Sequence, residues 1–426
     1  MADNGTLHRN FKTACCWAVI LLFFVVLAEV ASYLILRAAI PARIRARVGC
    51  GSAAYHVAQR QNAHRAQPRI INAPERLGEA AGASSRLILY HPELGWDYPP
   101  NLEYEDIDGT LYRHGPGGER LTCTSFGTTS IATYGDSFAY GSEVKDDCTW
   151  QTFLAEEIGT NVVNFGVGGY GTDQAYLKYR LQGRPGVKLV MLCLWPENIN
   201  RVVNIYRPFY QHGDALTLTK PRFVRDRDGF AFVPNPLKSA ADTARLSDES
   251  FIRQLGQLDY WYQLDQRLPS LSFPYCLSLF KWRRPVFEQF AFSLSGLLPL
   301  NWRPAYPWNL FDEPEPFDIL CHITDCFVLT ARSRGSSPVI VILPHKDTIR
   351  EVMNHRSGRH ARFIDYLKQR QYPFVEVVQA IADLKPNYSQ LDQWYHVHAT
   401  TEGNRITAHV VAEYLARNPS LLKETP

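Results

Sequence analysis

Five short apolar runs constrain the fold of this chain more than any other feature of its sequence. Each run is bounded by turn residues, and its members are nearly all apolar instead of alternating with polar residues. Strands that helices cover on both faces need this continuous apolar character, whereas a strand with one face in water alternates. The pattern therefore predicts a parallel sheet with strands at residues 130–134, 162–165, 189–194, 338–343 and 374–378.

Segments with helical periodicity separate these runs, at residues 149–158, 172–182, 318–333 and 362–370. Alternation of strands and helices is typical of a doubly wound α/β fold. Between the third and fourth runs lie roughly 140 residues, far more than one crossover connection needs. We therefore expect an insertion at residues 205–310, made of loops and short helices that form a lid or substrate wall. For its Trp and Phe clusters we expect burial under long loops, with a membrane-touching surface as the alternative.

The segment from Cys15 to Leu36 is strongly apolar, and Glu29 is its only charged residue. About 20 such residues cross the hydrocarbon core of a bilayer as a helix. The run is longer than the apolar region of a signal peptide, and no small-residue cleavage site follows it clearly, so we expect an uncleaved single-pass anchor. A buried core helix is the alternative, although the segment is too uniformly apolar and too isolated at the terminus for that role.

The membrane side of the following domain is less sharply indicated. Arg9 and Lys12 precede the span, and four arginines follow it, at positions 37, 43, 45 and 47. Counted literally, the positive-inside rule places the catalytic domain in the cytoplasm, but a long domain can translocate regardless of such charges. We expect a periplasmic or extracellular catalytic domain and leave the orientation open.

The predicted organisation is a short tail at residues 1–14, a transmembrane anchor at 15–37, a juxtamembrane linker at 38–85 and a catalytic domain at 86–426. A β-rich, irregular segment opens that domain. The composition, with 46% hydrophobic and 20% charged residues, is that of a folded protein with a large core. A net charge of +3 without a basic stripe gives no support to nucleic-acid binding. Among nine cysteines, Cys123 and Cys148 could form a disulfide or remain inert thiols.

The first apolar run leads directly into Gly135-Asp136-Ser137. A serine in the tight turn between a parallel strand and a helix projects its hydroxyl into the crevice where α/β sheets bind ligands. The Asp-Ser pair could alternatively do no more than cap the helix that follows. Ser137 is therefore a candidate nucleophile that needs support from other segments.

Two further strand ends carry groups suited to bind an oxyanion. The second run leads into a loop with glycines at positions 166, 168, 169 and 171, whose backbone N–H groups can approach a ligand closely. A phosphate-binding glycine loop is the alternative, but its spacing does not fit. The third run ends before Asn198, whose amide can donate to a developing oxyanion or serve only as a turn residue.

Near the C-terminus, His398 lies just before an amphipathic helical segment at residues 406–417. A histidine in that loop can reach a serine at the first strand end and take its proton near neutral pH. His396 and His398 could in principle bind a metal ion, but no third ligand is evident in the sequence. We expect neither a metal nor a cofactor.

Taken in order, these four segments resemble the signature blocks of the SGNH/GDSL hydrolase superfamily over roughly residues 129–416. The resemblance implies a flavodoxin-like three-layer α/β/α sandwich with a five-stranded parallel sheet. It also implies that Ser137 is the nucleophile, that Gly169 and Asn198 form the oxyanion hole and that His398 is the base.

Two positions depart from the family pattern. Members of the family commonly have Asp after the oxyanion Asn, where this chain has Ile199, so the contact that usually steadies that loop is in doubt. They also place the Asp of the triad two or three residues before the His, where this chain has Tyr395 and His396. Asp392 is the nearest upstream acid and our tentative third member. A backbone carbonyl that orients the ring, or a weakened site, are the alternatives.

We therefore expect a serine esterase or acyl hydrolase that acts on an ester, such as an O-acetyl ester, of a carbohydrate or lipid-linked substrate. O-acyl transfer by the same fold is one alternative. A non-catalytic glycan-binding or assembly protein with a degenerate triad is the other. A carboxylate within hydrogen-bond reach of His398 Nδ1 would favour the enzyme, and a His398 ring turned away from Ser137 would favour the binding protein.

Overall fold

The computed structural model describes residues 4–47, 50–63, 69–71, 87–106, 109–127, 129–212, 216–227, 229–268, 271–295, 297 and 308–422. The chain forms two compact units, each built from separate parts of the sequence. The first combines Met1–Ser52 with Leu264–Trp308, and the second combines Ala53–Gln263 with Asn309–Pro426. Most of the second half of the linker predicted at 38–85 lies outside the described residues.

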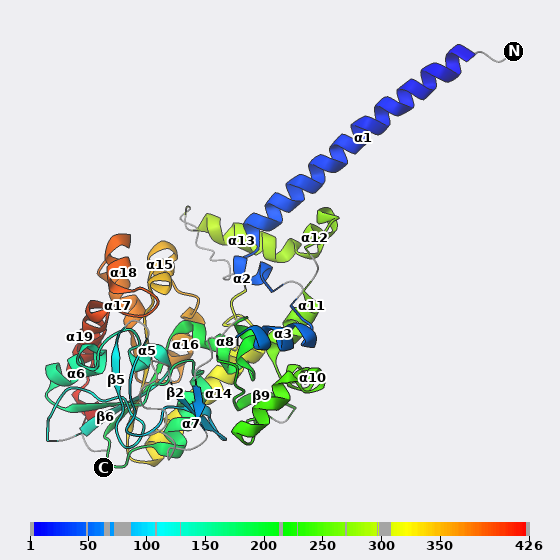
Figure 1. The fold of residues 1–426 in the computed structure, drawn as a ribbon. Helices are drawn as coiled ribbons and strands as arrows, with labels where there is room; N and C mark the ends of the chain where they lie inside the picture. The colour runs from blue at the N-terminus through cyan, green and yellow to red at the C-terminus, as the bar shows by residue number, and fades with distance from the viewer. Residues whose placement is uncertain are drawn as a thin grey trace. The chain divides into compact units, whose positions relative to one another are not determined.

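A five-stranded parallel sheet forms the centre of the second unit (Figure 1). Its strands are β6 (Thr129–Tyr134), β7 (Asn161–Asn164), β8 (Leu189–Leu194), β11 (Ser337–Ile342) and β12 (Phe374–Glu376). The order across the sheet is β12-β11-β8-β6-β7, and each neighbouring pair is parallel. All six residues of the central strand β8 are buried, as its apolar sequence requires. The five predicted strands and the flavodoxin-like order are thus confirmed.

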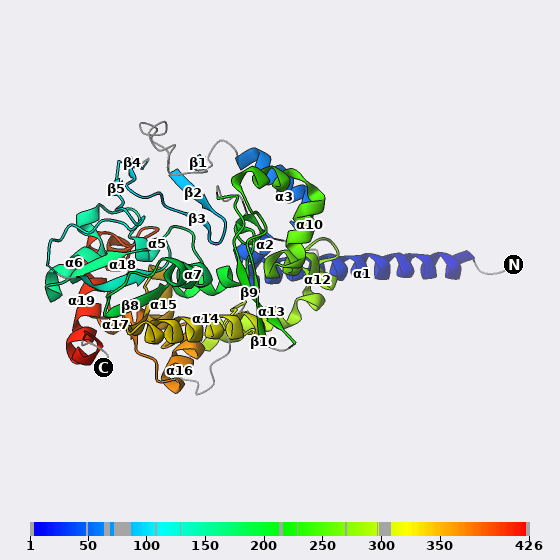
Figure 2. The same ribbon diagram turned by 90° about the horizontal axis from the view of Figure 1, so that it is seen from below.

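Helices cover both faces of this sheet (Figure 2). On one face, α7 (Thr172–Gln182) packs against α14 (Pro314–Ser333), and both contact the sheet. On the other face, α6 (Trp150–Ile158) and α17 (Val377–Asp383) pack against α19 (Thr401–Arg417). The helix predicted at residues 362–370 corresponds to α16 (Ala361–Gln369), which contacts α14. The three-layer α/β/α arrangement follows from this division.

Short strands precede the sheet in the chain, as the β-rich segment predicted. They are β1 (Arg69–Ile71), β2 (Leu87–His91), β3 (Gly95–Asp97), β4 (Glu103–Glu105) and β5 (Leu111–Arg113). Trp96 on β3 is buried and donates from Nε1 to the carbonyl oxygen of Gly168 at 3.0 Å. Tyr170 returns a hydrogen bond from its hydroxyl to the Trp96 carbonyl oxygen at 2.6 Å. The lead-in therefore holds the glycine-rich loop that follows β7.

The predicted insertion at 205–310 is divided between the two units. Its first part belongs to the second unit and contains α9 (Arg207–Tyr210), the antiparallel pair β9 (Arg222–Asp226) and β10 (Gly229–Val233), η4 (Ala240–Ser247) and α10 (Glu249–Gln257). Helix α10 packs against α3 (Ala53–Ala63). Helix α11 (Tyr260–Arg267) contains the boundary, and α12 (Tyr275–Lys281) and α13 (Arg283–Ser295) belong to the first unit.

The first unit contains α1 (Asn4–Ala39), α2 (Ala42–Arg45), α12 and α13. Within α1, the stretch Lys12–Ala39 is long and apolar enough to cross a membrane. The C-terminal end of α1 packs against α12 and α13. The buried core of this unit consists of Leu36, Ala39, Ile40, Ile44, Trp282 and Val286. Arg47 and Asp265 form a buried ion pair beside this core, with Nε and Oδ1 separated by 2.7 Å. Residues far apart in the sequence therefore share one small core.

Candidate active site

Ser137 is the first residue of the short helix α5 (Ser137–Tyr140), just after β6. Gly135 makes this tight turn possible, because a Cβ at that position would collide with Ala139 and with the carbonyl oxygen of Cys193. Asp136 caps α5 by accepting a hydrogen bond from Phe138 N at 2.9 Å. The capping role considered for the Asp-Ser pair thus falls to Asp136, and the Ser137 hydroxyl is engaged elsewhere.

His398 lies in a tight turn between α18 (Tyr388–Trp394) and α19. An antiparallel bridge joins Tyr395 and Ala399, and His396 N donates to the His398 carbonyl oxygen at 2.9 Å. Thr400 caps α19, which fixes the end of the turn. The turn brings His398 Nε2 to 2.9 Å from Ser137 Oγ, although the two residues are 261 positions apart.

The carboxylate beside His398 belongs to Glu143. Its Oε1 lies 2.8 Å from His398 Nδ1, and its Oε2 accepts from the His398 backbone N at 3.2 Å. Asp392, our tentative third member, is engaged elsewhere: its Oδ1 accepts from Lys346 at 3.1 Å and from Arg350 at 2.9 Å. The described hydrogen bonds therefore join Ser137 to His398 and His398 to Glu143. Asp392 takes no part in this series of hydrogen bonds.

Glu143 follows α5 in a backbone conformation that favours its contact with His398. Its φ is 71°, in the left-handed region that few non-glycine residues adopt. The backbone N of Glu143 donates to the hydroxyl of Tyr112 at 2.9 Å, which holds the turn. The family pattern places the acid just upstream of the histidine, and Glu143 lies 255 positions away from His398 in the sequence. The sequence signal for Glu143 was an acidic residue six positions after Ser137, in the turn that leaves α5.

The pKa of Glu143 reflects its contact with His398. Burial alone would raise this pKa, but the hydrogen bonds and the positive charge of a protonated His398 outweigh burial and lower it. Glu143 therefore stays ionised near neutral pH and can orient the imidazole by accepting the Nδ1 proton. A carboxylate at this place also stabilises the imidazolium that forms when His398 takes a proton.

The glycine-rich loop after β7 lies against α5. A Cβ on Gly166 would collide with the backbone of Ala139 and Tyr140, so only glycine permits this close approach. Gly169 has φ of 82°, and its carbonyl oxygen accepts from Arg207 at 3.1 Å. This hydrogen bond holds the Gly169 carbonyl group, and the neighbouring Val167 and Tyr170 N–H groups donate within the protein.

Asn198 ends η3 (Pro196–Asn198), directly after β8. Its side chain is 1% exposed, and its Oδ1 has no hydrogen-bond partner among the described residues. A buried amide atom without a partner costs about 1–3 kcal/mol, so such groups usually serve a ligand or a bound water. The unpartnered Oδ1 is an acceptor and calls for a donor such as a water molecule, so the group of Asn198 that could bind an oxyanion is its Nδ2 amide.

Arg201 on α8 (Ile199–Val202) joins the three strand-end loops. Its Nη1 lies 3.3 Å from Asp136 Oδ2 and donates to the Tyr170 carbonyl oxygen at 3.0 Å, and its Nη2 lies 2.9 Å from Glu197 Oε2. The side chain is only 7% exposed. The chain has Ile199 where the family has Asp, and Arg201 supplies a different contact that steadies the same loops. Sequence reasoning missed this residue because only the contacts reveal its role.

Aromatic rings form one wall of the site. Phe138 packs against Trp195 and His398, with ring centroids at 4.8 and 4.9 Å. His345, which caps α15 (Lys346–His355) after β11, packs against Trp195 at 5.3 Å. Burial lowers the pKa of His345, so this second histidine is neutral near pH 7. The sequence analysis did not single out His345 or Trp195 as site residues.

Both cysteines considered for a disulfide are free thiols in the structure. Cys148 ends η2 (Asp146–Cys148), and Cys123 is exposed. The neighbouring Asp146 instead forms the polar contact in this region, because its carboxylate accepts from Arg120 Nε at 3.0 Å and Arg113 Nε at 2.9 Å. Ion pairs, not a disulfide, therefore hold the segment between α5 and α6.

The strand order is the flavodoxin-like order of a doubly wound α/β fold. The serine, glycine and asparagine segments follow β6, β7 and β8, and the histidine turn precedes the last long helix, as the resemblance to SGNH/GDSL hydrolases implies. Solved structures with a similar chain path include G-D-S-L family proteins from Desulfitobacterium hafniense DCB-2 and Veillonella parvula DSM 2008, at 11% and 9% identity and TM-scores of 0.32. Each covers 68% of this chain and is itself covered in full. An SGNH-type protein from Slackia heliotrinireducens has 12% identity and a TM-score of 0.28, and it is covered over 99% of its length. No protein-family model and no curated protein matches the sequence.

Proposed function

We propose that this protein is a serine ester hydrolase in which Ser137, His398 and Glu143 form the catalytic triad. The observation that carries the proposal is the unbroken chain of contacts, with 2.9 Å between Ser137 Oγ and His398 Nε2 and 2.8 Å between His398 Nδ1 and Glu143 Oε1. A nucleophile, a base and a group that orients the base, each within hydrogen-bond reach of the next, is the arrangement that activates a serine. The same contacts weigh against a binding protein with a degenerate triad.

In the proposed reaction, Ser137 Oγ attacks the ester carbonyl carbon while its proton passes to His398 Nε2. The alcohol leaves with that proton, and an acyl-serine remains. Water then attacks the acyl-serine, His398 takes a proton from the water, and the acid is released as Ser137 recovers its proton. Glu143 keeps the His398 Nδ1–H oriented throughout and stabilises the transient imidazolium.

The proposed oxyanion hole contains the Ser137 and Gly169 N–H groups and the Asn198 side-chain amide. The burial of Asn198 and the left-handed backbone at Gly169 support this assignment. Donors fixed by the protein stabilise the charge that develops on the carbonyl oxygen, and each is worth about 10²–10³ in rate in a well-studied serine protease. Arg201 acts as a positioning residue, because it joins the three loops that carry these donors.

For the substrate we propose an O-acyl ester, such as an O-acetyl ester, on a carbohydrate or lipid-linked molecule. The aromatic wall of Phe138 and Trp195 supports a substrate with an apolar or flat face at this site. Acyl transfer to another hydroxyl is the second candidate, because it passes through the same acyl-serine and differs only in the acceptor. Turnover of a model acetyl ester in the presence of an acceptor alcohol distinguishes the two activities. Transfer yields a new ester of that alcohol, whereas hydrolysis yields the free acid.

Covalent labelling tests the proposed nucleophile. A fluorophosphonate probe should label the full chain in membranes or detergent, and Ser137→Ala should abolish that labelling. Hydrolysis of p-nitrophenyl acetate should fall on the order of 10³-fold or more in the same variant. Equal labelling of both proteins would refute the proposal, as would wild-type protein that neither labels nor hydrolyses any short acyl ester while remaining folded.

We also propose that α1 anchors the protein in a membrane as a single span. The length and apolar character of Lys12–Ala39 support this, although a signal sequence has the same features. The full chain should remain in the membrane pellet after alkaline carbonate extraction, with its N-terminal residues still attached. Protease protection of residues 86–426 in sealed vesicles then reports the membrane side, for which we expect the periplasmic or extracellular face.

A further inference from the structure

Helices α12 and α13 expose a row of large apolar side chains in the first unit. On α13, Phe287, Phe290 and Leu294 are 67%, 46% and 51% exposed, and their spacing of three and four residues places them on one helix face. On α12 and just before it, Phe273, Leu277 and Phe280 are also exposed. The expectation that the aromatic clusters of the insertion are buried is thus wrong for these phenylalanines.

The other residues of these helices divide between a buried side and a charged surface. Trp282 and Val286 pack into the core with the C-terminal end of α1. Lys281, Arg283 and Arg284 are exposed, and Arg283 lies over the Phe280 ring at 4.4 Å. A short helix with an apolar face beside lysine and arginine is typical of segments that lie in the plane of a membrane interface.

The start of α12 is bonded directly to the candidate membrane span. The carboxylate of Glu29, the only charged side chain from Cys15 to Leu36, accepts hydrogen bonds from the backbone N of Tyr275 and of Cys276. Ser32 Oγ lies 3.3 Å from Cys276 Sγ, and the rings of Tyr33 and Tyr275 are 5.1 Å apart. A charge inside a span is costly unless it is paired, and here the first amides of α12 pair it.

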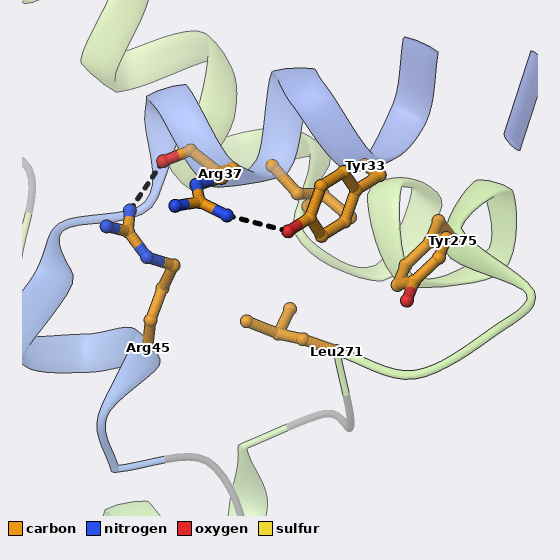
Figure 3. Close-up of a pocket in the computed structure, with 6 residues that line it drawn as sticks. Tyr33, Arg37, Arg45, Leu271 and Tyr275 are labelled. Carbon is orange, nitrogen blue, oxygen red and sulfur yellow. Dashed lines mark hydrogen bonds between the residues drawn. The ribbon is translucent and has the colours of Figure 1, made fainter. Parts of the chain in front are cut away.

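A pocket lies beside the C-terminal part of α1 (Figure 3). It is lined by Tyr33, Leu36, Arg37, Arg45, Leu271 and Tyr275. Arg37 donates to the Tyr33 hydroxyl at 2.8 Å, and Arg45 donates to the Arg37 carbonyl oxygen at 2.5 Å. Tyrosines and arginines gather at the headgroup level of bilayers. Trp17 lies 16 residues before Tyr33, about 24 Å along a helix, so both aromatic rings fall within the roughly 30 Å of a hydrocarbon core and its boundaries.

From these contacts we infer that α12 and α13 form a second membrane-binding element, which embeds its apolar face in the acyl chain and headgroup boundary next to α1. The inference rests on the proposal that α1 spans the membrane. Figure 1 shows both helices at the C-terminal end of α1, and they contact it. Their first amides bind Glu29 four residues, or about 6 Å, from Tyr33, which is the depth at which interfacial helices lie. Continuity with the span favours lipid over a second copy as the occupant of this face.

Photo-crosslinking to lipid tests this inference in the full chain. Benzoylphenylalanine replaces Phe287 or Phe290, and the protein is reconstituted in nanodiscs of phosphatidylcholine with phosphatidylglycerol. Gln289 is the matched control, since it lies on the same helix about 160–200° around the axis from Phe287. Phe23, an exposed residue of α1, is the positive control. Mass spectrometry counts lipid adducts, and fluorophosphonate labelling or protease resistance verifies that each variant is folded.

We expect roughly fivefold or more lipid adducts at Phe287 and Phe290 than at Gln289, at a level similar to Phe23. If Phe23 reacts with lipid and both α13 positions react no more than Gln289, the inference is overturned and the anchor stands. Adducts to a second chain at Phe287 would assign the face to a protein interface and overturn it as well. If Phe23 also fails to react with lipid, both the anchor and the inference fail.

Discussion

The backbone conformation of Glu143 determines which carboxylate forms the hydrogen bond with His398. The residue has φ of 71°, and the Tyr112 hydroxyl accepts from its N–H, so a local contact holds a conformation that is otherwise rare. Both carboxylate oxygens contact His398, one at Nδ1 and one at the backbone N. Two contacts orient the ring more firmly than one, and this supports the assignment of Glu143 as the group that sets the His398 tautomer.

Replacement of Glu143 by Gln should lower kcat by about 10²–10⁴-fold, because the amide cannot stabilise the imidazolium and can stabilise the wrong tautomer. The matched control is Asp392→Asn, whose exposed contacts with Lys346 and Arg350 are far less coupled to the site. We expect this control to retain kcat within about twofold, as is usual for surface changes. Steady-state kinetics with a short acyl ester measures both, and a larger loss in Asp392→Asn would return the role to Asp392.

His114 lies outside the cluster of Ser137, His398 and Glu143 and gives the folded chain a pH-dependent stability of its own. Burial, with the nearby charge of Arg120, lowers the pKa of His114 to about 3 from an ordinary value of 6.5. At pH values between these two pKa values, His114 is therefore protonated in the unfolded chain and neutral in the folded chain. The resulting stability is present above the unfolded pKa and is lost as the pH falls toward the folded pKa.

Lowering the pH from 7 to 5 should therefore cost on the order of 2 kcal/mol of folding free energy through His114 alone. His114→Phe keeps a ring beside Tyr98, which stacks on His114 at 4.7 Å, but it removes the titrating group. We expect the variant to lose less stability than the wild type over this range. Thermal unfolding in detergent at the two pH values measures the difference, and parallel losses would contradict the assignment.

The loops at the ends of β6, β7 and β8 depend on one another through Arg201. Its guanidinium contacts Asp136, the Tyr170 carbonyl oxygen and Glu197, one from each loop. The planar, multidentate guanidinium can serve three partners at once, which a lysine ammonium does less well. Because the guanidinium is buried, these contacts are strong. Removal of the guanidinium would leave its partners buried without a cation, which destabilises the folded state.

Arg201→Met should therefore destabilise the protein by about 3–5 kcal/mol, since it leaves the buried Asp136 carboxylate without its cation. Arg201→Lys should recover part of the loss. The control is Arg253→Met, which breaks an exposed pair with Glu249 on α10 and should cost less than about 1 kcal/mol. Urea unfolding compares the three variants. Equal stability of Arg201→Met and Arg253→Met would show that Arg201 does not hold the loops.

The molecule consists of two units, each of which is built from two separate segments of the chain. The first unit takes the end of α1 and the segment that begins near Asp265, and its core needs both. The second unit contains the whole parallel sheet and the candidate triad. An anchor that only tethered the protein would leave residues after the span free of such a core. Here the C-terminal end of α1, the proposed span, is itself part of a folded unit.

Two truncations test whether the end of α1 is part of that unit. A chain that begins at Ser32 keeps Leu36, Ile40, Ile44 and Arg47, and it should protect α12 and α13 from limited proteolysis in detergent. A chain that begins at Gly51 loses these residues, exposes Trp282 and leaves Asp265 buried without Arg47, at a cost of about 3–5 kcal/mol for the ion pair alone. We expect rapid cleavage within 264–297 only in the shorter chain, and mass spectrometry locates the cuts.

Much of the fold and part of the candidate site could be predicted from the sequence. The strands and helices of the second unit are encoded in the spacing of apolar residues among near neighbours, so periodicity alone located β8 and α7 at their observed bounds. Ser137 and His398 were identified because their segments resemble the family's blocks. The tertiary structure alone decided that Glu143 pairs with His398, that Arg201 joins three loops and that the insertion is divided between two units. Glu143 and His398 are 255 positions apart, and such contacts depend on how the whole chain packs, which no local pattern records.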